Sequence, residues 1–574
     1  MDRKSNEFYR KLKPVVAIGA QNFKSIRESG AFYIDKTSFI KEWWENQDVV
    51  TLIIRPRRFG KTLNMSMTEH FFSNQYAGCA DLFEGLTIWK DAAYRSLQGS
   101  YPVLFVSFAG IKSDSYETAR EGIIQIIIDL YAKYRFLLQG DSLNVQEKDY
   151  FNYIEPGMSD AVAVMSLHRL TLCMTRYYGK KVILLLDEYD TPLQEAYVNG
   201  YWEKLTIFIR SLFHCTFKTN PYMERGLLTG ITRIGKESIF SDLNNLEVVT
   251  TTSDKYVSSF GFTEEEVKTA LELFDMTEKL EKVKFWYDGF RFGNKIDLYN
   301  PWSITKYLDR KRCEPYWVNT SSNNLIRILI QRGSPEIKVA FEDLLMGRQI
   351  VSALDEEIVF DQLEESDAAI WSFLLASGYL KADRVLETEE EGETQYCLSL
   401  TNLEVKKEFR KMVRQWFQNP SARYHDFIKA LLAGDVDYMN EYMNRIALQT
   451  FSSFDTGKHP SGRSEPERFY HGFVLGLIVD LADRYKITSN RESGFGRYDV
   501  VMEPLQSGLD AFVMEFKVFH PEREKDLHET VKHALQQIAE KEYDADLIAG
   551  GIQKGHIRHY AIAFEGKHIL VGSA

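Results

Sequence analysis

The stretch that most constrains the fold is residues 55–62, Arg-Pro-Arg-Arg-Phe-Gly-Lys-Thr, which follows an apolar run starting at Val49 and precedes a helix-compatible run starting at Leu63. A strand, a tight loop with Gly-Lys-Thr and a helix are the context of a phosphate-binding loop. Backbone N–H groups at the helix N-terminus hold an anion, the lysine reaches the outer phosphates, and the threonine hydroxyl can hold Mg²⁺. The pattern has glycine at the position of Arg55, so the stretch needs support from elsewhere in the chain.

A second signal comes from residues 182–186, which are continuously apolar and are followed by Asp187, Glu188, Tyr189 and Asp190. Such a run is typical of a strand buried on both faces of a parallel sheet, and ligands bind at the carboxyl ends of such strands. We expect Asp187 to hold Mg²⁺ through water and Glu188 to polarise the attacking water. A core strand with a solvated acidic end is the alternative.

Two more apolar runs, near residues 102–108 and 225–231, alternate with helical patterns and predict a three-layer α/β domain. At the end of the second run, Thr229, Thr232 or Arg233 could sense the terminal phosphate, because arginine presents forked donors. A solvated arginine is the more common situation at a strand end. Residues 14–47 favour a turn, a short strand and a capped helix, with a lid over a nucleotide base as the alternative.

The composition limits the compartment and the partners. The length of 574 residues is typical of three or four domains, and the net charge of −12 argues against coating nucleic acid through a global field. A locally basic cleft on an acidic protein is still compatible with a nuclease. The five dispersed cysteines indicate buried thiols in a reducing compartment, not disulfides or a metal cluster. No signal-peptide core or bilayer-spanning apolar stretch is present, so we predict a cytoplasmic protein without a membrane partner.

The middle of the chain predicts a helical module. Residues 374–380 lead into an acidic loop at 387–393 and a strand near 396–400, which suggests a winged-helix-like unit. The acidic loop argues against contact with phosphates and favours a packing role. The polar segment 452–466 is typical of a flexible loop near a domain boundary. The predicted domains are therefore residues 1–320, 321–450 and 451–574.

Two predicted strands near the C-terminus, residues 498–502 and 511–518, have the spacing of a hairpin that would bring Asp499 near Glu515. Because side chains alternate along a strand, Glu515 and Lys517 share one face. Two carboxylates and a lysine on one face are unfavourable unless a cation neutralises them. Mg²⁺ prefers carboxylate oxygens, and the lysine can orient or deprotonate a water that attacks a phosphodiester. A solvated strand edge is the alternative.

Residues 15–320 resemble the predicted AAA-type ATPases. The resemblance rests on residues 55–62 together with Leu-Leu-Leu-Asp-Glu-Tyr-Asp at 184–190 and Leu-Thr-Gly-Ile-Thr-Arg at 228–233. The pattern of that family tolerates arginine at position 55. The resemblance implies a P-loop NTPase domain that binds ATP and Mg²⁺, with Thr62 and Asp187 at the metal. The residues implied in nucleotide binding are Arg55, Arg57, Arg58, Gly60, Lys61, Thr62, Asp187 and Arg233.

Residues 467–570 resemble the PD-(D/E)XK nuclease superfamily in the form that follows this ATPase. The resemblance rests on the Asp499, Glu515 and Lys517 spacing, the run at 489–499 and the Ala-Leu-Gln-Gln-Ile segment at 534–538. The usual proline before the aspartate is replaced by Tyr498. The resemblance implies an α/β nuclease-like domain in which Asp499 and Glu515 ligate the metal and Lys517 serves the water. Glu467 would add a carboxylate, and Gln537 would position metal or phosphate.

Together the two resemblances imply an ATPase, which hydrolyses ATP or binds it as a switch, joined through the predicted winged-helix-like module to a Mg²⁺-dependent nuclease. Control of cleavage by ATP is a hypothesis that rests on the presence of both parts in one chain. Nucleic acid is the expected partner, with DNA favoured over RNA, and a homo-oligomer is compatible with the sequence. Two alternatives stay open. One is a regulatory or signalling ATPase whose nuclease-like domain binds nucleic acid or a protein without cleaving. The other is a nuclease whose ATPase fold is structural and insensitive to nucleotide.

Overall fold

The computed structural model describes residues 15–232, 239–240, 243–318, 325–326, 329–330, 335–354, 366–387, 394–417, 424–450, 474, 478, 481, 484–493, 496–506, 508–566 and 568–574. The chain divides into two compact units. The first comprises Met1–Leu329 and Val351–Val405, and the second Ile330–Ile350 and Lys406–Ala574. The boundaries at 320 and 450 stay a prediction.

The first unit is built on a five-stranded sheet in the order β2-β3-β4-β1-β5, in which all pairings are parallel. β1 and β3 are buried along their whole length, which explains their continuously apolar sequences. The registers place Ile54 beside Gly230 and Ser107 beside Asp187, so the carboxyl ends of β1, β3 and β4 meet at one edge. The strands are β1 (Val50–Ile54), β2 (Val103–Ser107), β3 (Val182–Asp187), β4 (Met223–Gly230) and β5 (Leu246–Val249).

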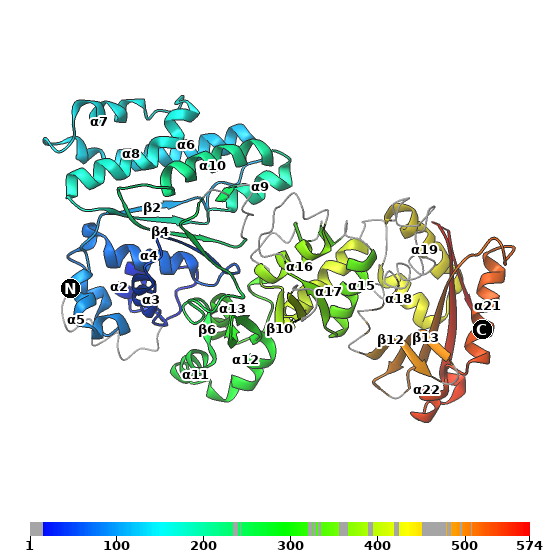
Figure 1. The fold of residues 1–574 in the computed structure, drawn as a ribbon. Coiled ribbons are helices and arrows are strands. Elements are labelled where there is room, and N and C mark those ends of the chain that lie inside the picture. Colours follow the sequence, from blue (N-terminus) through cyan, green and yellow to red (C-terminus); the bar gives the residue numbers. More distant parts are fainter. Residues whose placement is uncertain are drawn as a thin grey trace. The chain divides into compact units, whose positions relative to one another are not determined.

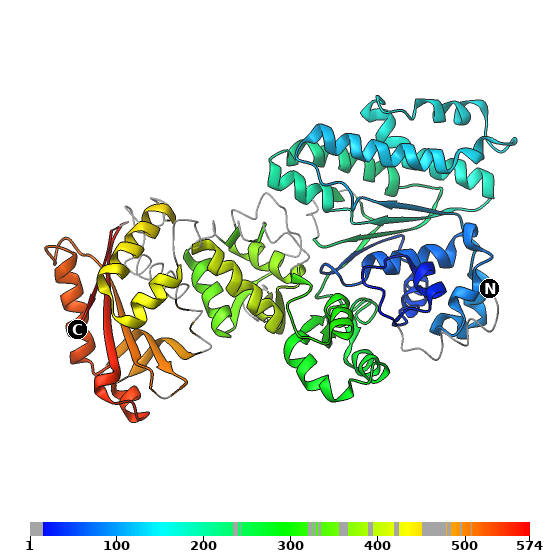
Figure 2. The same cartoon turned by 180° about the vertical axis from the view of Figure 1, so that it is seen from behind.

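Helices cover both faces of this sheet, which confirms the predicted three-layer α/β domain (Figures 1 and 2). The longest of the described helices, α8 (Asp160–Tyr178), has an N-cap at Ser159 and a C-cap at Gly179 in the left-handed conformation. One face carries α6 (Tyr116–Lys133), α8 (Asp160–Tyr178), α9 (Thr191–Asn199) and α10 (Trp202–Phe217), with α7 (Val145–Tyr150) outside them. The other carries α2 (Phe23–Ser29), α3 (Ser38–Asn46), α4 (Lys61–Phe72) and α5 (Ala92–Leu97).

The rest of the first unit contains a small sheet in the order β6-β8-β7 and a β-hairpin, β10–β11, which pairs with β9. The predicted helix, Gly-Tyr-Leu turn and hairpin are present as α16, residues 378–380 and β10–β11. The elements are β6 (Phe262–Thr263), α11 (Glu264–Leu273), α12 (Leu280–Tyr287), β7 (Phe290–Phe292), β8 (Lys295–Tyr299), α13 (Pro301–Arg310), β9 (Ile350–Ala353), α16 (Asp367–Ala376), β10 (Leu380–Glu387) and β11 (Thr394–Leu400). The helix α17 (Leu403–Phe417) begins in the first unit and continues into the second, because the division falls between Val405 and Lys406.

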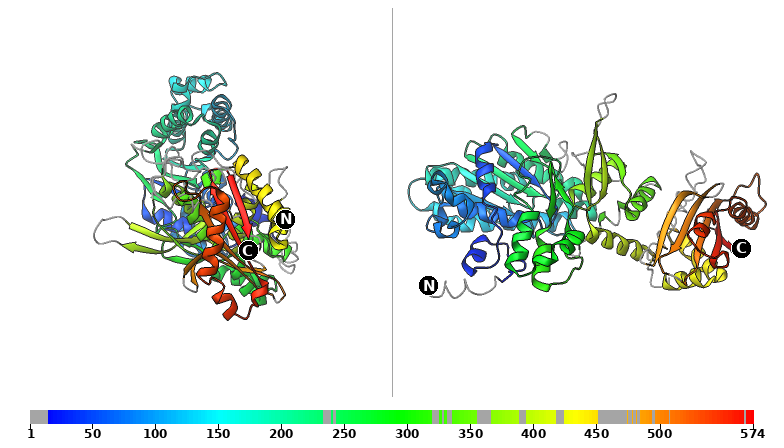
Figure 3. Two further views of the ribbon diagram at one scale, coloured as in Figure 1. Left: turned by 90° about the vertical axis from the view of Figure 1, so that its right-hand side faces the viewer. Right: turned by 90° about the horizontal axis from the view of Figure 1, so that it is seen from below.

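The second unit is built on a mixed five-stranded sheet in the order β12-β13-β14-β15-β16, in which only β14 and β15 are parallel. Ala561 on β15 packs against α21, whereas the Tyr560 hydroxyl donates to the Leu431 carbonyl of α18, so helices cover both faces (Figure 3). The elements are α15 (Pro335–Met346), α18 (Tyr424–Ala433), α19 (Val436–Thr450), β12 (Tyr485–Ser493), β13 (Gly496–Pro504), β14 (Ala511–Val518), α21 (Leu527–Glu540), α22 (Ala545–Ala549), β15 (Ile557–Glu565) and β16 (His568–Ser573).

Candidate functional site

The loop at residues 55–60 joins β1 to α4, as the sequence predicts for a phosphate-binding loop. Gly60 caps α4 with a φ of 83°, a left-handed conformation that glycine adopts without strain. Arg58 also has a positive φ, 65°, and its side chain lies over the Trp302 ring at 4.4 Å. The first N–H groups of a helix have no partner within the helix, so the start of α4 can bind an anion.

Lys61 lies inside this loop. Its Nζ donates to the carbonyl oxygens of Arg55 at 2.8 Å and Pro56 at 2.9 Å. Burial lowers the pKa of Lys61 to about 8, while the nearby acids, Glu188 first among them, act in the opposite direction. The ammonium is thus held next to the start of α4 by two neutral acceptors, which a phosphate can replace because it is charged.

Thr62 and Asp187 meet as predicted for a Mg²⁺ site. The Thr62 hydroxyl donates to Asp187 Oδ2 at 2.9 Å, and the Thr229 hydroxyl donates to Asp187 Oδ1 at 2.6 Å. Burial raises the pKa of Asp187, and these two hydrogen bonds oppose the rise. A hydroxyl and a carboxylate at the end of the phosphate-binding loop are oxygen ligands that suit Mg²⁺, so the residues present fit the ion. Thr229 therefore fixes Asp187 instead of facing a phosphate.

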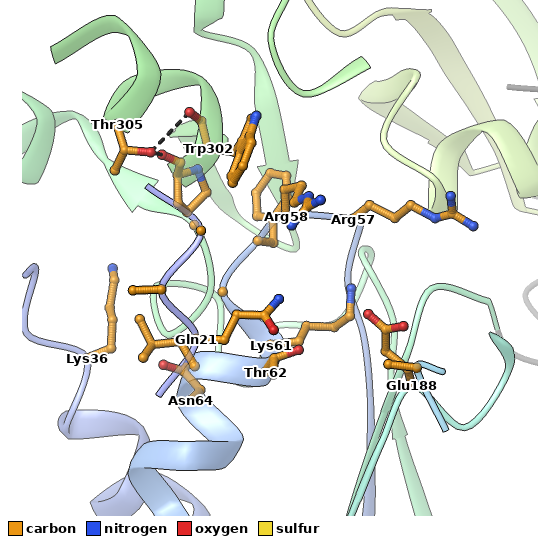
Figure 4. A pocket seen from close by; sticks show the side chains of 18 of the residues that line it. Gln21, Lys36, Arg57, Arg58, Lys61, Thr62, Asn64, Glu188, Trp302 and Thr305 are labelled. Carbon is orange, nitrogen blue, oxygen red and sulfur yellow. Dashed lines mark hydrogen bonds between the residues drawn. The ribbon is translucent and has the colours of Figure 1, made fainter. Parts of the chain in front are cut away.

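Glu188 is held in an unusual backbone conformation, with a φ of 53°. Its N–H donates to the Thr229 hydroxyl at 3.3 Å, and its Oε2 accepts from the Thr191 hydroxyl at 3.1 Å. Figure 4 shows Lys61 and Glu188 at the same end of the pocket. A left-handed glutamate is conformationally unfavourable and is a recurring feature of functional sites.

Asp190 has a role that the sequence analysis did not assign. Its buried Oδ2 accepts from the N–H groups of Ile231 and Thr232 at 2.9 and 3.0 Å, from the Thr232 hydroxyl at 3.0 Å and from Gln194 Nε2 at 2.9 Å. These bonds join the start of α9 to the end of β4. The position of Asp190 three residues after Asp187 is the signal that could have revealed it. Thr232 is thereby committed to Asp190, and Arg233 lies outside the described residues.

The structure corrects the expectation that the Arg55 side chain binds nucleotide. The guanidinium is fully buried and donates to the carbonyls of Ile54, Thr250 and Lys255 at 2.9, 2.6 and 3.2 Å. It also lies over the Phe292 ring at 4.4 Å. Arg55 is not among the residues that line the pocket. Hydrogen bonds to these carbonyls thus hold the side chain of the arginine that replaces glycine in this loop.

The loop opens into a pocket of about 520 Å³ (Figure 4). Its lining combines Lys61, Thr62, Glu188 and Arg57 with several apolar side chains, so the pocket suits a ligand with phosphates and an apolar ring. Part of the lining comes from the N-terminal segment, as expected for the lid alternative of residues 14–47. The apolar lining residues include Val16, Ile26, Phe32, Ile34 and Phe262.

The second unit brings the predicted acidic and basic residues together on one sheet face. Val500 pairs with Met514, so the antiparallel register sets Asp499 opposite Glu515. The N–H of Phe516 donates to Asp499 Oδ2 at 2.7 Å, and Lys517 Nζ lies 3.1 Å from Glu515 Oε1. The predicted hairpin and its register are confirmed. Glu467 lies outside the described residues.

Gln537 reaches this site from α21. Its Nε2 donates to Glu515 Oε1 and, at 2.9 Å, to the hydroxyl of Tyr543, a residue that the sequence analysis did not single out. No group of three or more His, Cys, Asp or Glu in the described part of the chain could hold a metal. Mg²⁺ is usually held by one or two carboxylates together with water and phosphate, so Asp499 and Glu515 fit this ion.

Comparisons with known proteins agree with both units. The model of the predicted AAA-ATPase family matches residues 17–240, and that of the PD-(D/E)XK nuclease superfamily matches residues 465–573. An uncharacterized protein in the vnfD 5′ region of Azotobacter chroococcum mcd 1 is 27% identical over 556 residues, covering 92% of each chain. Within the described residues, no helix is long and apolar enough to span a membrane. The chain therefore combines a predicted AAA-ATPase-like domain at residues 17–240 with a PD-(D/E)XK nuclease superfamily domain at residues 465–573.

Proposed function

We propose that the chain binds and hydrolyses ATP in the pocket of the first unit and cleaves nucleic-acid phosphodiester bonds at the site of the second. The observation that carries the nucleotide site is the 2.9 Å contact between Thr62 and Asp187, which joins the loop to β3. The nuclease site is supported by the convergence of Glu515, Lys517 and Gln537. DNA is the proposed substrate, and the cytoplasm the proposed location.

In the nucleotide pocket, the start of α4 and Lys61 would bind the phosphates. Thr62 and Asp187 would hold Mg²⁺, which neutralises phosphate charge when bound. Glu188, fixed by Thr191, would accept a hydrogen bond from the attacking water and orient it toward the terminal phosphate. The apolar side chains of the lining, Phe32 and Ile34 among them, would contact the base.

In the nuclease site, Asp499 and Glu515 would hold Mg²⁺, which supplies positive charge at the scissile phosphate when bound. The Phe516 N–H fixes the Asp499 carboxylate, and Gln537 fixes that of Glu515. Lys517 is one-third exposed, with 33% of its side chain accessible, whereas only 2% of the Glu515 side chain is. The Lys517 ammonium can therefore reach a substrate phosphate or a water, while the Glu515 carboxylate stays buried.

The test is cleavage of a panel of DNA and RNA substrates with Mg²⁺, with and without ATP. We expect Lys517→Ala to abolish cleavage. Lys486→Ala is the matched control, because this lysine of the same unit is exposed and pairs with Glu503. Lys61→Ala should abolish ATP binding and, under the proposed ATP control, the ATP response of cleavage.

Two results would change the proposal. A wild-type protein that binds ATP but cleaves no substrate would support a regulatory ATPase whose second unit binds without cleaving. Cleavage that is identical with and without ATP, and unaffected by Lys61→Ala, would support a nuclease with a structural ATPase fold.

A further inference from the structure

Arg57 lies on the wall between two pockets of the first unit. A second pocket, of about 140 Å³, shares Arg57, Gln194, Glu195 and Ile231 with the larger one. The remaining wall of this second pocket is mostly aromatic and apolar and includes Trp317, Leu325, Ile326, Phe373 and Tyr379. From one backbone position, the long Arg57 side chain can therefore reach either pocket.

The Arg57 side chain lies against Gln194 on the wall that the two pockets share. One of its guanidinium nitrogens donates to Gln194 Oε1 at 3.0 Å. Figure 4 shows the side chain extending away from Lys36, Gln21 and Trp302. The Arg57 carbonyl accepts from Asn300 Nδ2 at 3.1 Å, which fixes the backbone while leaving the side chain able to turn.

Gln194 is itself fixed in the orientation that binds Arg57. Its Nε2 donates to Asp190 Oδ2 at 2.9 Å, so its Oε1 is directed to the arginine. Asp190 is anchored by the N–H groups at the end of β4. Gln194 is thus a rigid but neutral acceptor for a charged donor.

A terminal phosphate next to Lys61 would compete with this acceptor. Arginine binds phosphate through two parallel charge-assisted hydrogen bonds, which are about twice as strong as neutral ones. The other two arginines of the loop are engaged elsewhere: Arg55 in the core and Arg58 over Trp302. A diphosphate lacks the terminal group, so it offers Arg57 no such acceptor.

We propose that Arg57 distinguishes nucleoside triphosphate from diphosphate by leaving Gln194 for the terminal phosphate. Gln194 is then a positioning residue that holds Arg57 at the shared wall until a triphosphate binds. This inference rests on the proposed binding of ATP. When Arg57 leaves, the environment of Trp317 in the second pocket changes, so this tryptophan reports the triphosphate state.

The test is calorimetric binding of ADP and of a non-hydrolysable ATP analogue to the full chain. Arg57→Ala should weaken binding of the analogue about tenfold and leave that of ADP unchanged. Gln194→Leu removes the competing acceptor and should tighten binding of the analogue by roughly fivefold. In the double variant, Gln194→Leu should have no effect, because it acts only through Arg57. Arg95→Ala, which changes an arginine outside both pockets, is the control.

A second measurement is the tryptophan fluorescence change on binding, compared between wild type and Trp317→Phe. The analogue should produce a Trp317 signal that ADP does not. Equal weakening of both nucleotides by Arg57→Ala, or an effect of Gln194→Leu that persists without Arg57, would overturn the inference. Wild type that binds neither nucleotide would instead refute the proposed function. Wild type that binds both, with an unchanged preference in Arg57→Ala, would refute the inference alone.

Discussion

Arg55 stands where the phosphate-loop pattern has glycine, so Arg55→Gly would restore the pattern. On sequence grounds this change should improve nucleotide binding. The structure instead predicts a loss of stability, because the guanidinium is a buried donor to the carbonyls of Ile54, Thr250 and Lys255. We therefore expect Arg55→Gly to destabilise the first unit and not to tighten ATP binding.

The magnitude follows from opposing contributions. Leaving three buried carbonyls without this donor costs about 6 kcal/mol, at about 2 kcal/mol each. The lost packing of the guanidinium on Phe292 and Phe260 adds about 2 kcal/mol. Against this, burial lowers the pKa of Arg55 to about 9, which corresponds to a desolvation penalty of about 5 kcal/mol that the variant no longer carries. The net loss is about 3 kcal/mol, or about 4 °C in melting temperature for a unit of this size.

The assay is differential scanning calorimetry of the full chain with and without ATP, which identifies the transition of the first unit as the one that ATP shifts. Arg58→Gly is the matched control, because Arg58 has a φ of 65°. Glycine there relieves about 1 kcal/mol of backbone strain, which offsets the lost contact with Trp302. Its melting temperature should stay near that of wild type. An Arg55→Gly variant that melts no lower than wild type and binds ATP more tightly would refute the reasoning.

Three further predictions concern other parts of the chain. Gly378→Ala places a Cβ 2.9 Å from two Pro56 side-chain atoms at a φ of +86°, so it should weaken ATP binding about tenfold in calorimetry; wild-type affinity would contradict this. Because the pKa of Lys61 is about 8 and binding needs the protonated ammonium, ATP affinity should be flat below that pH and fall about tenfold per unit above it. The Lys61→Arg variant should not show this fall. An affinity of the wild type that does not change between pH 7 and 9.5 would exclude titration of Lys61 as the cause. The Asn440 side chain donates to the Val571 carbonyl at 2.9 Å and accepts from the Val571 N–H at 2.7 Å. Asn440→Ala should therefore destabilise the second unit by about 2 kcal/mol and speed hydrogen exchange of the Val571 N–H. Unchanged protection of this N–H would contradict the prediction.

Features that depend on local periodicity could be predicted from the sequence. The apolar runs at β1 and β3 identified central strands, because strands buried on both faces leave no polar alternation. Thr62 and Asp187 could be paired because the carboxyl ends of parallel strands meet at one edge of the sheet. A different argument placed Asp499 opposite Glu515: their strands are antiparallel neighbours, and the length of the connection fixes the register of a hairpin.

Features that depend on contacts between distant side chains and backbone could not be predicted. Arg55 binds carbonyls about 200 residues later in the chain, at Thr250 and Lys255, and such a contact leaves no periodic pattern. The left-handed backbone of Glu188 is equally invisible, because no residue type in the sequence requires it. The interpretation of Arg55 as a nucleotide contact failed for this reason: the motif specifies the backbone of the loop but not the direction of each side chain.

The phosphate-binding loop is supported by residues beyond the segment that matches the ATPase family, which ends at residue 240. Asn300 holds the Arg57 carbonyl at 3.1 Å, and the Phe59 ring lies 4.7 Å from that of Phe290. Gly378 approaches Pro56 so closely that a Cβ would not fit, and its carbonyl accepts from the Thr401 hydroxyl at 2.8 Å. These contacts fix the backbone from which Lys61 and Arg57 extend. The structural unit of nucleotide binding therefore extends to about residue 405, and a fragment that ends at residue 240 would contain the motif without the support that shapes it.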